Sequence, residues 1–301
     1  MATDRNAAKI TVVLMTRNRV EELVHALERL HELPEEPPIV VVDNGSSDGT
    51  SERVARQFPD VEVLTLSGNL GVEARNIAVR RVSTPYVAFN DDDSWWAPGS
   101  LARAVELFAA HPRLGAVAAN ILVEPGSRRD PISVEMENSP LTADPGVPGV
   151  PVLGFLACAA AVRTAAYEEV GGFERRLHFA GEEELLATDL TSHGWEVRFL
   201  PELTVHHQPS TARDSVWRAR RGVRNALWTL WLRRPAGSAL GRSVHLLRST
   251  DPTTAALGLA QALRGLPWVL RQRRVVPAHV ERQLRLLQPD QDRSEARRHV
   301  A

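Results

Sequence analysis

Three consecutive aspartates, Asp91, Asp92 and Asp93, end a mostly apolar, strand-like run that begins at Pro85. Mg²⁺ and Mn²⁺ bind carboxylate oxygens, and they often take only one or two from the protein together with phosphate oxygens of a substrate. A short carboxylate cluster at a strand end therefore suits a complex of a divalent metal with a nucleotide. The alternative is an exposed acidic turn before a helix that begins near Pro98, because such acidic spacings are common in loops.

Other polar residues stand just past three further apolar runs. They are Thr16 and Arg17 after the first run, Asp43 and Asn44 after the second, and Asn69, followed by Arg75, after the third. Each is by itself an ordinary turn signal, because Asn, Asp and Gly supply the hydrogen bonds and the positive φ of tight turns. At one sheet edge they can act together, since a carboxylate can accept a hydrogen bond from a base and a guanidinium can face phosphate.

The elements that must position these residues alternate between strand and helix. Residues 10–15 form a continuous apolar run rich in β-branched side chains, which is typical of a strand buried on both faces. A helical pattern from Leu23 to Leu30 follows, and then a strand, a helix and a strand at 39–42, 51–57 and 61–66. This order predicts an α/β fold with a mostly parallel sheet flanked by helices, in which ligands bind at the carboxyl ends of the strands.

Composition indicates a real core but two electrostatic parts. The chain has 301 residues, of which 43% are hydrophobic and 24% charged, enough for one large or two modest domains. Residues 1–210 hold 18 Lys and Arg against 31 Asp and Glu, and residues 211–301 hold 18 against 6, so the net charges are −13 and +12. We expect an α/β domain over residues 1–214 and a basic, Arg- and Trp-rich helical extension over 215–301.

Targeting signals are not evident. The single cysteine, Cys158, cannot form an intrachain disulfide, and residues 1–9 hold no apolar signal-peptide core. No stretch approaches the roughly 18 to 20 apolar residues that cross a bilayer. We therefore expect a cytoplasmic protein, at most peripheral at the inner face of the plasma membrane.

Three ordered motifs resemble those of family 2 glycosyltransferases with the GT-A fold. They are Val-Val-Asp-Asn-Gly-Ser-Ser-Asp-Gly-Thr at 41–50, Asn-Leu-Gly-Val-Glu-Ala-Arg-Asn at 69–76 and Asn-Asp-Asp-Asp at 90–93. Each motif is weak alone, but the ordered set is specific, and the similarity covers about residues 9 to 210.

The resemblance implies a GT-A, Rossmann-like domain that transfers a sugar from a nucleotide-diphosphate-sugar donor to a hydroxyl acceptor, with inversion at the anomeric carbon. The acceptor class is a glycan, a lipid-linked molecule or a small molecule, and the enzyme class is a hexosyl- or deoxyhexosyltransferase of cell-wall or polysaccharide biosynthesis. A divalent metal, Mn²⁺ or Mg²⁺, would be held by Asp91 and Asp93. Thr16, Asp43 and Arg75 match nucleotide-contacting positions, and we place Arg17, Asn44, Asn69 and Asp92 with them as nucleotide-sugar-binding residues.

A third acidic cluster begins at Gly181. Three glutamates there are chemically ordinary, because carboxylates favour the positive end of a helix dipole. The family's Gly-Glu-Asp element matches Gly181-Glu182-Glu183, so Glu183 falls on the position of the base that takes the proton of the acceptor hydroxyl. Neighbouring helical residues point about 100 degrees apart, so only one faces a given atom, and Glu182 and Glu184 stay open as alternatives. Two departures are the glutamate at 183, usually aspartate, and Leu185, often acidic in relatives, which points to an altered acceptor side.

His206 and His207 follow a strand-like segment at 197–200 and resemble the histidine segment that closes the family's domain. A neutral imidazole can complete a Mn²⁺ shell or contact the diphosphate. Adjacent strand residues face opposite sides, so at most one of the two acts there. His207 is the first choice as a metal ligand and His206 the reserve.

Two further segments each allow two interpretations. Residues 124–151 contain six prolines and no sustained period, which predicts a long loop that either covers the acceptor site or is a surface insertion. From Ser215 a helical pattern combines Trp with Arg, which suits a membrane interface or packed helices with arginine stems over the core. We favour peripheral membrane contact, since many sugar transferases use lipid-linked acceptors, and expect no nucleic-acid partner because no such motif is present.

Two other functions are kept as alternatives. A nucleotidyltransferase on a similar sheet lacks support, because no glycine-rich, lysine-bearing phosphate loop follows the first strand. A silent nucleotide-sugar sensor or scaffold is disfavoured by the presence of both the aspartate cluster and the Glu182-Glu183 pair.

Overall fold

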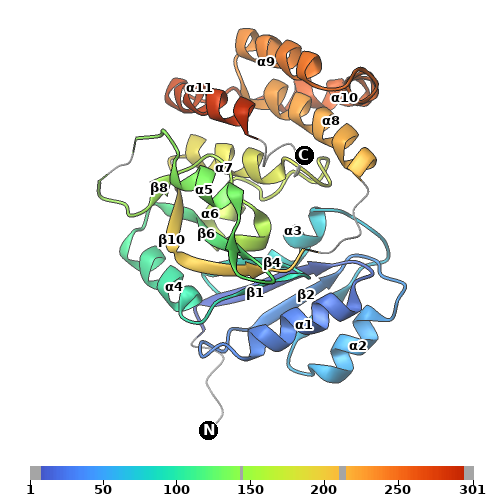
Figure 1. Cartoon of the computed structure of the whole chain (residues 1–301), viewed down its shortest axis with the longest axis vertical. Coiled ribbons are helices and arrows are strands. Elements are labelled where there is room, and N and C mark those ends of the chain that lie inside the picture. Colours follow the sequence, from blue (N-terminus) through green and yellow to red (C-terminus); the bar gives the residue numbers. More distant parts are fainter. Residues whose placement is uncertain (1–7, 143–144, 210–214, 295–301) are drawn as a thin grey trace.

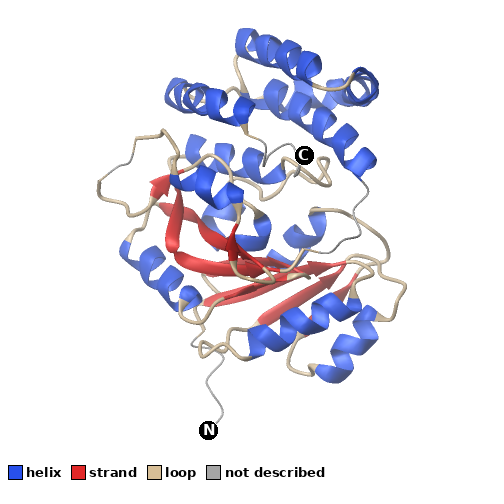
Figure 2. Cartoon of the chain, viewed as in Figure 1, coloured by secondary structure: helices blue, strands red, loops and turns tan. Residues whose placement is uncertain are grey.

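A computed structural model describes residues 8–142, 145–209 and 215–294 of the protein. A ten-stranded sheet forms its centre, with the order β3-β2-β1-β4-β9-β6-β10-β5, β7 beside β6 and β8 beside β10 (Figure 2). The strands are β1 Ile10–Thr16, β2 Ile39–Asp43, β3 Glu62–Thr65, β4 Tyr86–Asp91, β5 Ser94–Trp96, β6 Leu114–Val123, β7 Arg128–Arg129, β8 Val150–Pro151, β9 Ala160–Arg163 and β10 Glu196–His207.

Helices cover both faces of this sheet (Figure 1). They are α1 Val20–His31, α2 Thr50–Gln57, α3 Glu73–Val79, α4 Ser100–Ala110, α5 Pro131–Glu137, α6 Thr164–Glu169, α7 Glu182–Ser192, α8 Ser215–Arg233, α9 Ala236–Ser249, α10 Pro252–Gln272 and α11 Ala278–Arg293, with a 3₁₀ turn, η2, at Ala157–Ala159.

The predicted parallel sheet is present, with antiparallel additions. β3, β2, β1 and β4 run parallel, and β10 runs parallel to β6. β9 is antiparallel to both β4 and β6, and β5 is antiparallel to β10. Thr16 lies opposite Asp43, and Met15 opposite Asp91, so the carboxyl ends of the three central strands are level.

Alternating side chains of the central strands build two cores, one on each face. On β1, Val12 and Leu14 join the core made with α1, α2 and α4, whereas Val13 joins the core made with α3, α5, α6 and α7. The continuous apolar run at 10–15 is therefore explained by burial on both faces. The sheet is a rigid support for the residues that follow its strand ends.

Helices α8 to α11 form a layer over α7, at the top of the view in Figure 1. Leu185 of α7, 2% exposed, packs with Val223 and Leu227 of α8. This packing accounts for the apolar side chain at position 185. None of the described helices is long and apolar enough to cross a membrane. The domain boundary at residue 214 falls outside the described residues and stays a prediction.

The prediction that residues 124–151 form one long loop is wrong in part. α5 begins at Pro131, and its N-cap Asp130 accepts a hydrogen bond from the backbone N–H of Ile132. Short strands β7 and β8 bind this segment to β6 and β10. The strand expected at 197–200 is also longer, because β10 continues through an irregularity in its pairing between Leu200 and Thr204 to His207.

Candidate active site

The aspartate cluster lies where β4 ends, among polar groups from the loop after β1. Thr16 Oγ1 donates to Asp92 Oδ2 at 2.9 Å. Arg19 Nη1 donates to Asp92 Oδ1 at 2.7 Å and to Asp93 Oδ2 at 3.1 Å. Sequence reasoning missed Arg19, although its position in the same post-strand loop as Thr16 and Arg17 was an available signal. Arg17 itself is exposed.

Asp92 is the central member of the cluster, and it is buried, as is Asp93. Burial raises its pKa, the positive charge of Arg19 opposes that rise, and the charge of Asp93 adds to it, so that the pKa reaches about 7. Its two hydrogen-bond partners fix its carboxylate in place. Asp92 therefore supports the cluster, in which Asp93 is similarly buried and Asp91 is the more exposed member.

Asp91 pairs with Arg75, a guanidinium that is itself buried. Burial would lower the pKa of Arg75, but the charges of Asp91, Glu183 and Glu182, in that order, raise it. Arg75 is therefore paired with Asp91, and the charges of the two glutamates also favour its cationic form. As the structure places it, this guanidinium faces Asp91, and the phosphate contact expected of it stays a prediction.

The other residues that the sequence predicts to bind the nucleotide sugar, Asp43, Asn44 and Asn69, form hydrogen bonds within their own loops. Asp43 accepts hydrogen bonds from the backbone N–H of Ser46 and from the hydroxyl of Ser51. Asn44 bonds the backbone of Leu70 and Gly71, and Asn69 Oδ1 accepts from the Gly71 N–H at 2.9 Å. Turn formation accounts for these contacts, and a carboxylate such as that of Asp43 retains lone pairs for a further donor.

The two histidines of β10 point to different partners. His207 lies opposite Ser94 in the pairing with β5, and its Nε2 is 3.4 Å from Asp93 Oδ1. His206 stacks on Trp95, and its Nδ1 is 2.8 Å from Glu124 Oε1. Of the two, His207 is the one that the structure brings to the aspartate cluster.

Asp91, Asp93 and His207 suit a divalent cation. Asp93 and His207 present an oxygen and a nitrogen donor side by side, and the Asp91 side chain is 39% exposed. This mixed donor set fits Mn²⁺, which accepts imidazole more readily than Mg²⁺ does. Within the described residues no three His, Cys, Asp or Glu side chains gather closely enough to hold a metal alone. Oxygens of a bound diphosphate would therefore have to complete the coordination shell.

The second acidic cluster opens α7, after Gly181, which has a φ of 85°. Glu182 is 3% exposed, and its Oε2 has no hydrogen-bond partner within the described structure. Burial and then the charge of Glu183 raise the pKa of Glu182 to about 8. Burial also raises the pKa of Glu183, whose Oε1 is 3.4 Å from the backbone nitrogen of Ala157, and the charge of Arg75 opposes that rise.

The loop before α7 is held by the helical extension, a contact that sequence reasoning missed. His178 and Ala180 both have positive φ, 64° and 72°, which costs about 1 kcal/mol or more for each non-glycine residue. The Asn225 side-chain amide of α8 donates to the carbonyls of Leu177, Phe179 and Ala180 at 3.0, 2.7 and 2.7 Å. Asn225 therefore stabilises the strained loop that carries the glutamates.

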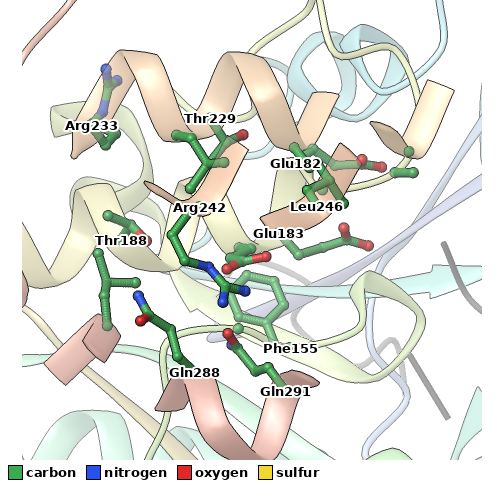
Figure 3. Close-up of a pocket in the computed structure, with 18 of the residues that line it drawn as sticks. Phe155, Glu182, Glu183, Thr188, Thr229, Arg233, Arg242, Leu246, Gln288 and Gln291 are labelled. Atoms are coloured by element: carbon green, nitrogen blue, oxygen red, sulfur yellow. The ribbon is translucent and has the colours of Figure 1, made fainter. Parts of the chain in front are cut away.

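A pocket of about 420 Å³ lies between α7 and the helical extension. Figure 3 shows Glu182 and Glu183 on its wall with Thr229, Arg242 and Leu246. The ring of Phe155 and the amides of Gln288 and Gln291 line it as well (Figure 3). The pocket thus joins the acidic start of α7 to apolar and amide groups that can hold a polyhydroxylated ligand.

Known proteins are similar to this chain in sequence and in fold. The model of glycosyl transferase family 2 matches residues 11–171, more than half of the chain. The chain belongs to glycosyl transferase family 2. It is similar to N-acetylglucosaminyl-diphospho-decaprenol L-rhamnosyltransferase of Mycobacterium tuberculosis, with 27% identity over 240 residues that cover 68% of this chain and 78% of that protein. It is also similar to the pre-mycofactocin glycosyltransferase of that organism, with 30% identity over 70% of this chain and 45% of that protein.

A solved structure shows the same fold. A mannosyltransferase from Pyrobaculum calidifontis, in complex with GDP-Man and Mn²⁺, superposes with a TM-score of 0.59 and 22% identity, over 98% of this chain and 78% of the other. The resemblance to family 2 and to the GT-A fold is therefore confirmed, and this protein is a glycosyltransferase.

Proposed function

We propose that this family 2 enzyme is a metal-dependent inverting glycosyltransferase that moves a sugar from a nucleotide-diphosphate sugar to a hydroxyl group. The observation that carries the proposal is the position of Arg75, whose charge interacts with Asp91 of one acidic cluster and with Glu183 and Glu182 of the other. In this proposal, the metal site that binds the donor diphosphate and the candidate bases both lie around the Arg75 guanidinium. An inverting transfer needs both, because the acceptor attacks the anomeric carbon opposite the leaving diphosphate.

Each group has a role in this proposal. Glu183 accepts the proton of the acceptor hydroxyl, and the charge of Arg75 opposes the rise in its pKa that burial causes. Asp91, Asp93 and His207 hold the cation, which when bound neutralises charge on the leaving diphosphate. Thr16 and Arg19 fix the buried Asp92 beside them, and Arg19 also donates to Asp93. Asp43, Asn44, Asn69 and Arg17 border the nucleotide.

We place the acceptor in the pocket beside Glu183, and we propose that it is lipid-linked. The name of the rhamnosyltransferase relative specifies a diphospho-decaprenol acceptor, which supports this class. A lipid-linked acceptor also requires that the enzyme reach a membrane surface. The cytoplasmic location expected from the sequence stays a prediction.

A donor screen tests the proposal. Release of nucleoside diphosphate is measured for a panel of nucleotide sugars with Mn²⁺, with Mg²⁺ and with excess chelator. We expect turnover of one donor class only when metal is present. A donor that binds tightly but is never turned over would support a silent binding protein, and full turnover in chelator would remove the metal from the mechanism.

A further inference from the structure

An open groove of about 500 Å³ lies between α8 and α10. Four arginines line it, and among the described residues no Asp or Glu does. The arginines are Arg220, Arg221 and Arg224 of α8 and Arg264 of α10, with the amide of Gln261 on the same wall of α10 as Arg264, and we call this site the arginine groove. Each guanidinium carries five N–H donors and no acceptor, so the groove offers a dense set of charged donors.

The two helices hold these donors in fixed positions. Residues three or four apart share a face of a helix, so Arg220 and Arg224 project from one side of α8. Gly258 of α10 allows the helices to approach closely, because a Cβ there would lie 2.6 Å from Val223. Trp228 Nε1 of α8 also donates to the Ala262 carbonyl of α10 at 2.9 Å. The groove is therefore formed before any ligand binds.

The protein does not neutralise the charge that it gathers here. Burial and then the charge of Arg221 lower the pKa of Arg224 to about 10. The Nε of Arg220 is buried and has no hydrogen-bond partner within the described structure, which is costly for a charged group. Asp251, whose charge interacts with Arg220, is already engaged as the N-cap of α10. Positive charge and donor capacity therefore remain for an anionic ligand.

The groove adjoins the loop before α7 at His178. Burial and then the charges of Arg221 and Arg224 lower the pKa of His178. Arg224 Nη2 also donates to the carbonyl of the preceding residue, Leu177, at 3.0 Å. On its other side, the His178 carbonyl accepts a hydrogen bond of 2.8 Å from the Val72 N–H. A ligand in the groove would therefore lie next to a loop that leads into α7 and is bonded to the segment before α3.

Guanidinium groups bind phosphate oxygens through paired hydrogen bonds. We propose that the arginine groove is a binding site for a phosphate or diphosphate group. Such a group belongs either to a water-soluble ligand or to the headgroup of a lipid, and the chemistry that recognises it is the same for both. The inference goes beyond the proposed function, which places the donor diphosphate at the aspartate cluster and assigns no anion to α8 or α10.

Calorimetric titration of the full chain with inorganic diphosphate, in excess chelator, tests the proposal. The chelator removes the metal that diphosphate would need in order to bind at the aspartate cluster. We expect diphosphate to bind wild type, and Arg220→Gln with Arg264→Gln to weaken binding on the order of 100-fold, because charge-assisted hydrogen bonds are lost. Arg264→Gln alone, which changes an exposed side chain and should leave the fold intact, should weaken it on the order of 10-fold.

The matched control is Arg248→Gln with Arg282→Gln, which removes the same charge from exposed positions of α9 and α11. This variant should bind diphosphate within a few fold of wild type. A second readout locates the ligand. In an NMR titration the pKa of His178 should rise when diphosphate is bound, because the anion offsets the charges of Arg221 and Arg224.

Competition separates the two sources of the phosphate group. Vesicles of phosphatidylcholine with phosphatidic acid present phosphate on a lipid surface. Displacement of diphosphate by these vesicles, but not by phosphatidylcholine alone, would support the site with a lipid headgroup as its ligand. Diphosphate binding that these vesicles do not affect would support the site with a water-soluble ligand.

Three outcomes would overturn the arginine groove as a phosphate site. They are failure of wild type to bind diphosphate, wild-type affinity in Arg220→Gln with Arg264→Gln, and a His178 pKa that does not change on binding. Hydrolysis of the nucleotide-sugar donor with Mn²⁺ separates this proposal from the proposed function. Intact hydrolysis without diphosphate binding in chelator removes only the groove site, whereas diphosphate binding without any turnover removes only the proposed activity.

Discussion

Asp93 is the carboxylate on which the proposed metal site depends, because it is the one beside His207. Asp93→Ala should abolish metal-dependent donor binding and lower turnover by about 100-fold or more, since a bound metal supplies several kcal/mol of charge stabilisation. Calorimetric titration of Mn²⁺ and donor checks this. Asp60→Ala, which removes an exposed carboxylate near His31, is the control. Wild-type donor binding by the Asp93 variant would show that the metal is held elsewhere.

Glu182 should make stability depend on pH. Because its pKa is raised in the folded protein from 4.5 to about 8, the native state keeps a proton that the unfolded chain loses. The protonated carboxyl contributes its full stabilisation below the pKa that Glu182 has in the unfolded chain. Between that pKa and the pKa in the folded protein, the free energy of unfolding falls by about 1.4 kcal/mol for each pH unit, and the contribution is lost as pH rises through the folded pKa. Glu182→Gln should therefore unfold at the same urea concentration as wild type at about pH 4 but at a higher one at about pH 9. An equal difference at both pH values would contradict the buried, protonated carboxyl.

At the scale of elements, the helical extension does more than cover the catalytic part. Asn225 of α8 holds three carbonyls of the loop that precedes α7, including that of Ala180. This contact makes the position of Glu183 depend on a helix more than 30 residues further along the chain. The extension and the base should therefore respond together to mutation.

Asn225→Ala should release this loop, with a loss of about 1 to 3 kcal/mol in stability for the unpaired groups and a lower turnover with little change in donor affinity. Ala180→Gly relieves the positive φ at that residue, so the double variant should recover part of the turnover. Turnover and donor affinity are measured for the Asn225→Ala variant and for the double variant. Asn138→Ala, whose amide donates to the Val134 carbonyl of α5, is the control. Unchanged turnover in Asn225→Ala would show that the extension has no part in positioning the base.

Much of the element order could be predicted from the sequence, because buried parallel strands and amphipathic helices carry strong periodic patterns. The seven-residue α5 could not, since prolines surround it and the segment has no sustained period, although Asp130 followed by Pro131 is a start signal for a helix. The pairing of Arg19 with Asp92, and of Asn225 with the loop at 177–180, joins residues more than 40 positions apart. Such contacts arise from tertiary packing, so a local pattern can point to a residue such as Arg19 but not to its partner.

At the scale of the whole molecule, the proposed cation site lies at the carboxyl end of β4, and the proposed base opens α7 on the wall of a pocket shared with the extension. The extension in turn carries eight of the ten large hydrophobic residues that are exposed in the described chain. In the proposed function, the donor binds to the acidic part of the chain, and the basic extension completes the pocket for the acceptor. This division accounts for a net charge of only −1 in a chain whose two parts are strongly charged.

The turnover of Glu183→Gln tests the central claim most directly. Glutamine keeps the size of the side chain but cannot accept a proton, so nucleoside diphosphate release should fall by about 100-fold or more while donor affinity stays within a few fold. Glu184→Gln, which removes the neighbouring carboxylate on α7, is the matched control and should retain most activity. If Glu183→Gln turns over at the wild-type rate while Glu182→Gln or Glu184→Gln is inactive, the base is misassigned. If all three variants are active, the inverting mechanism proposed for this glycosyltransferase is wrong.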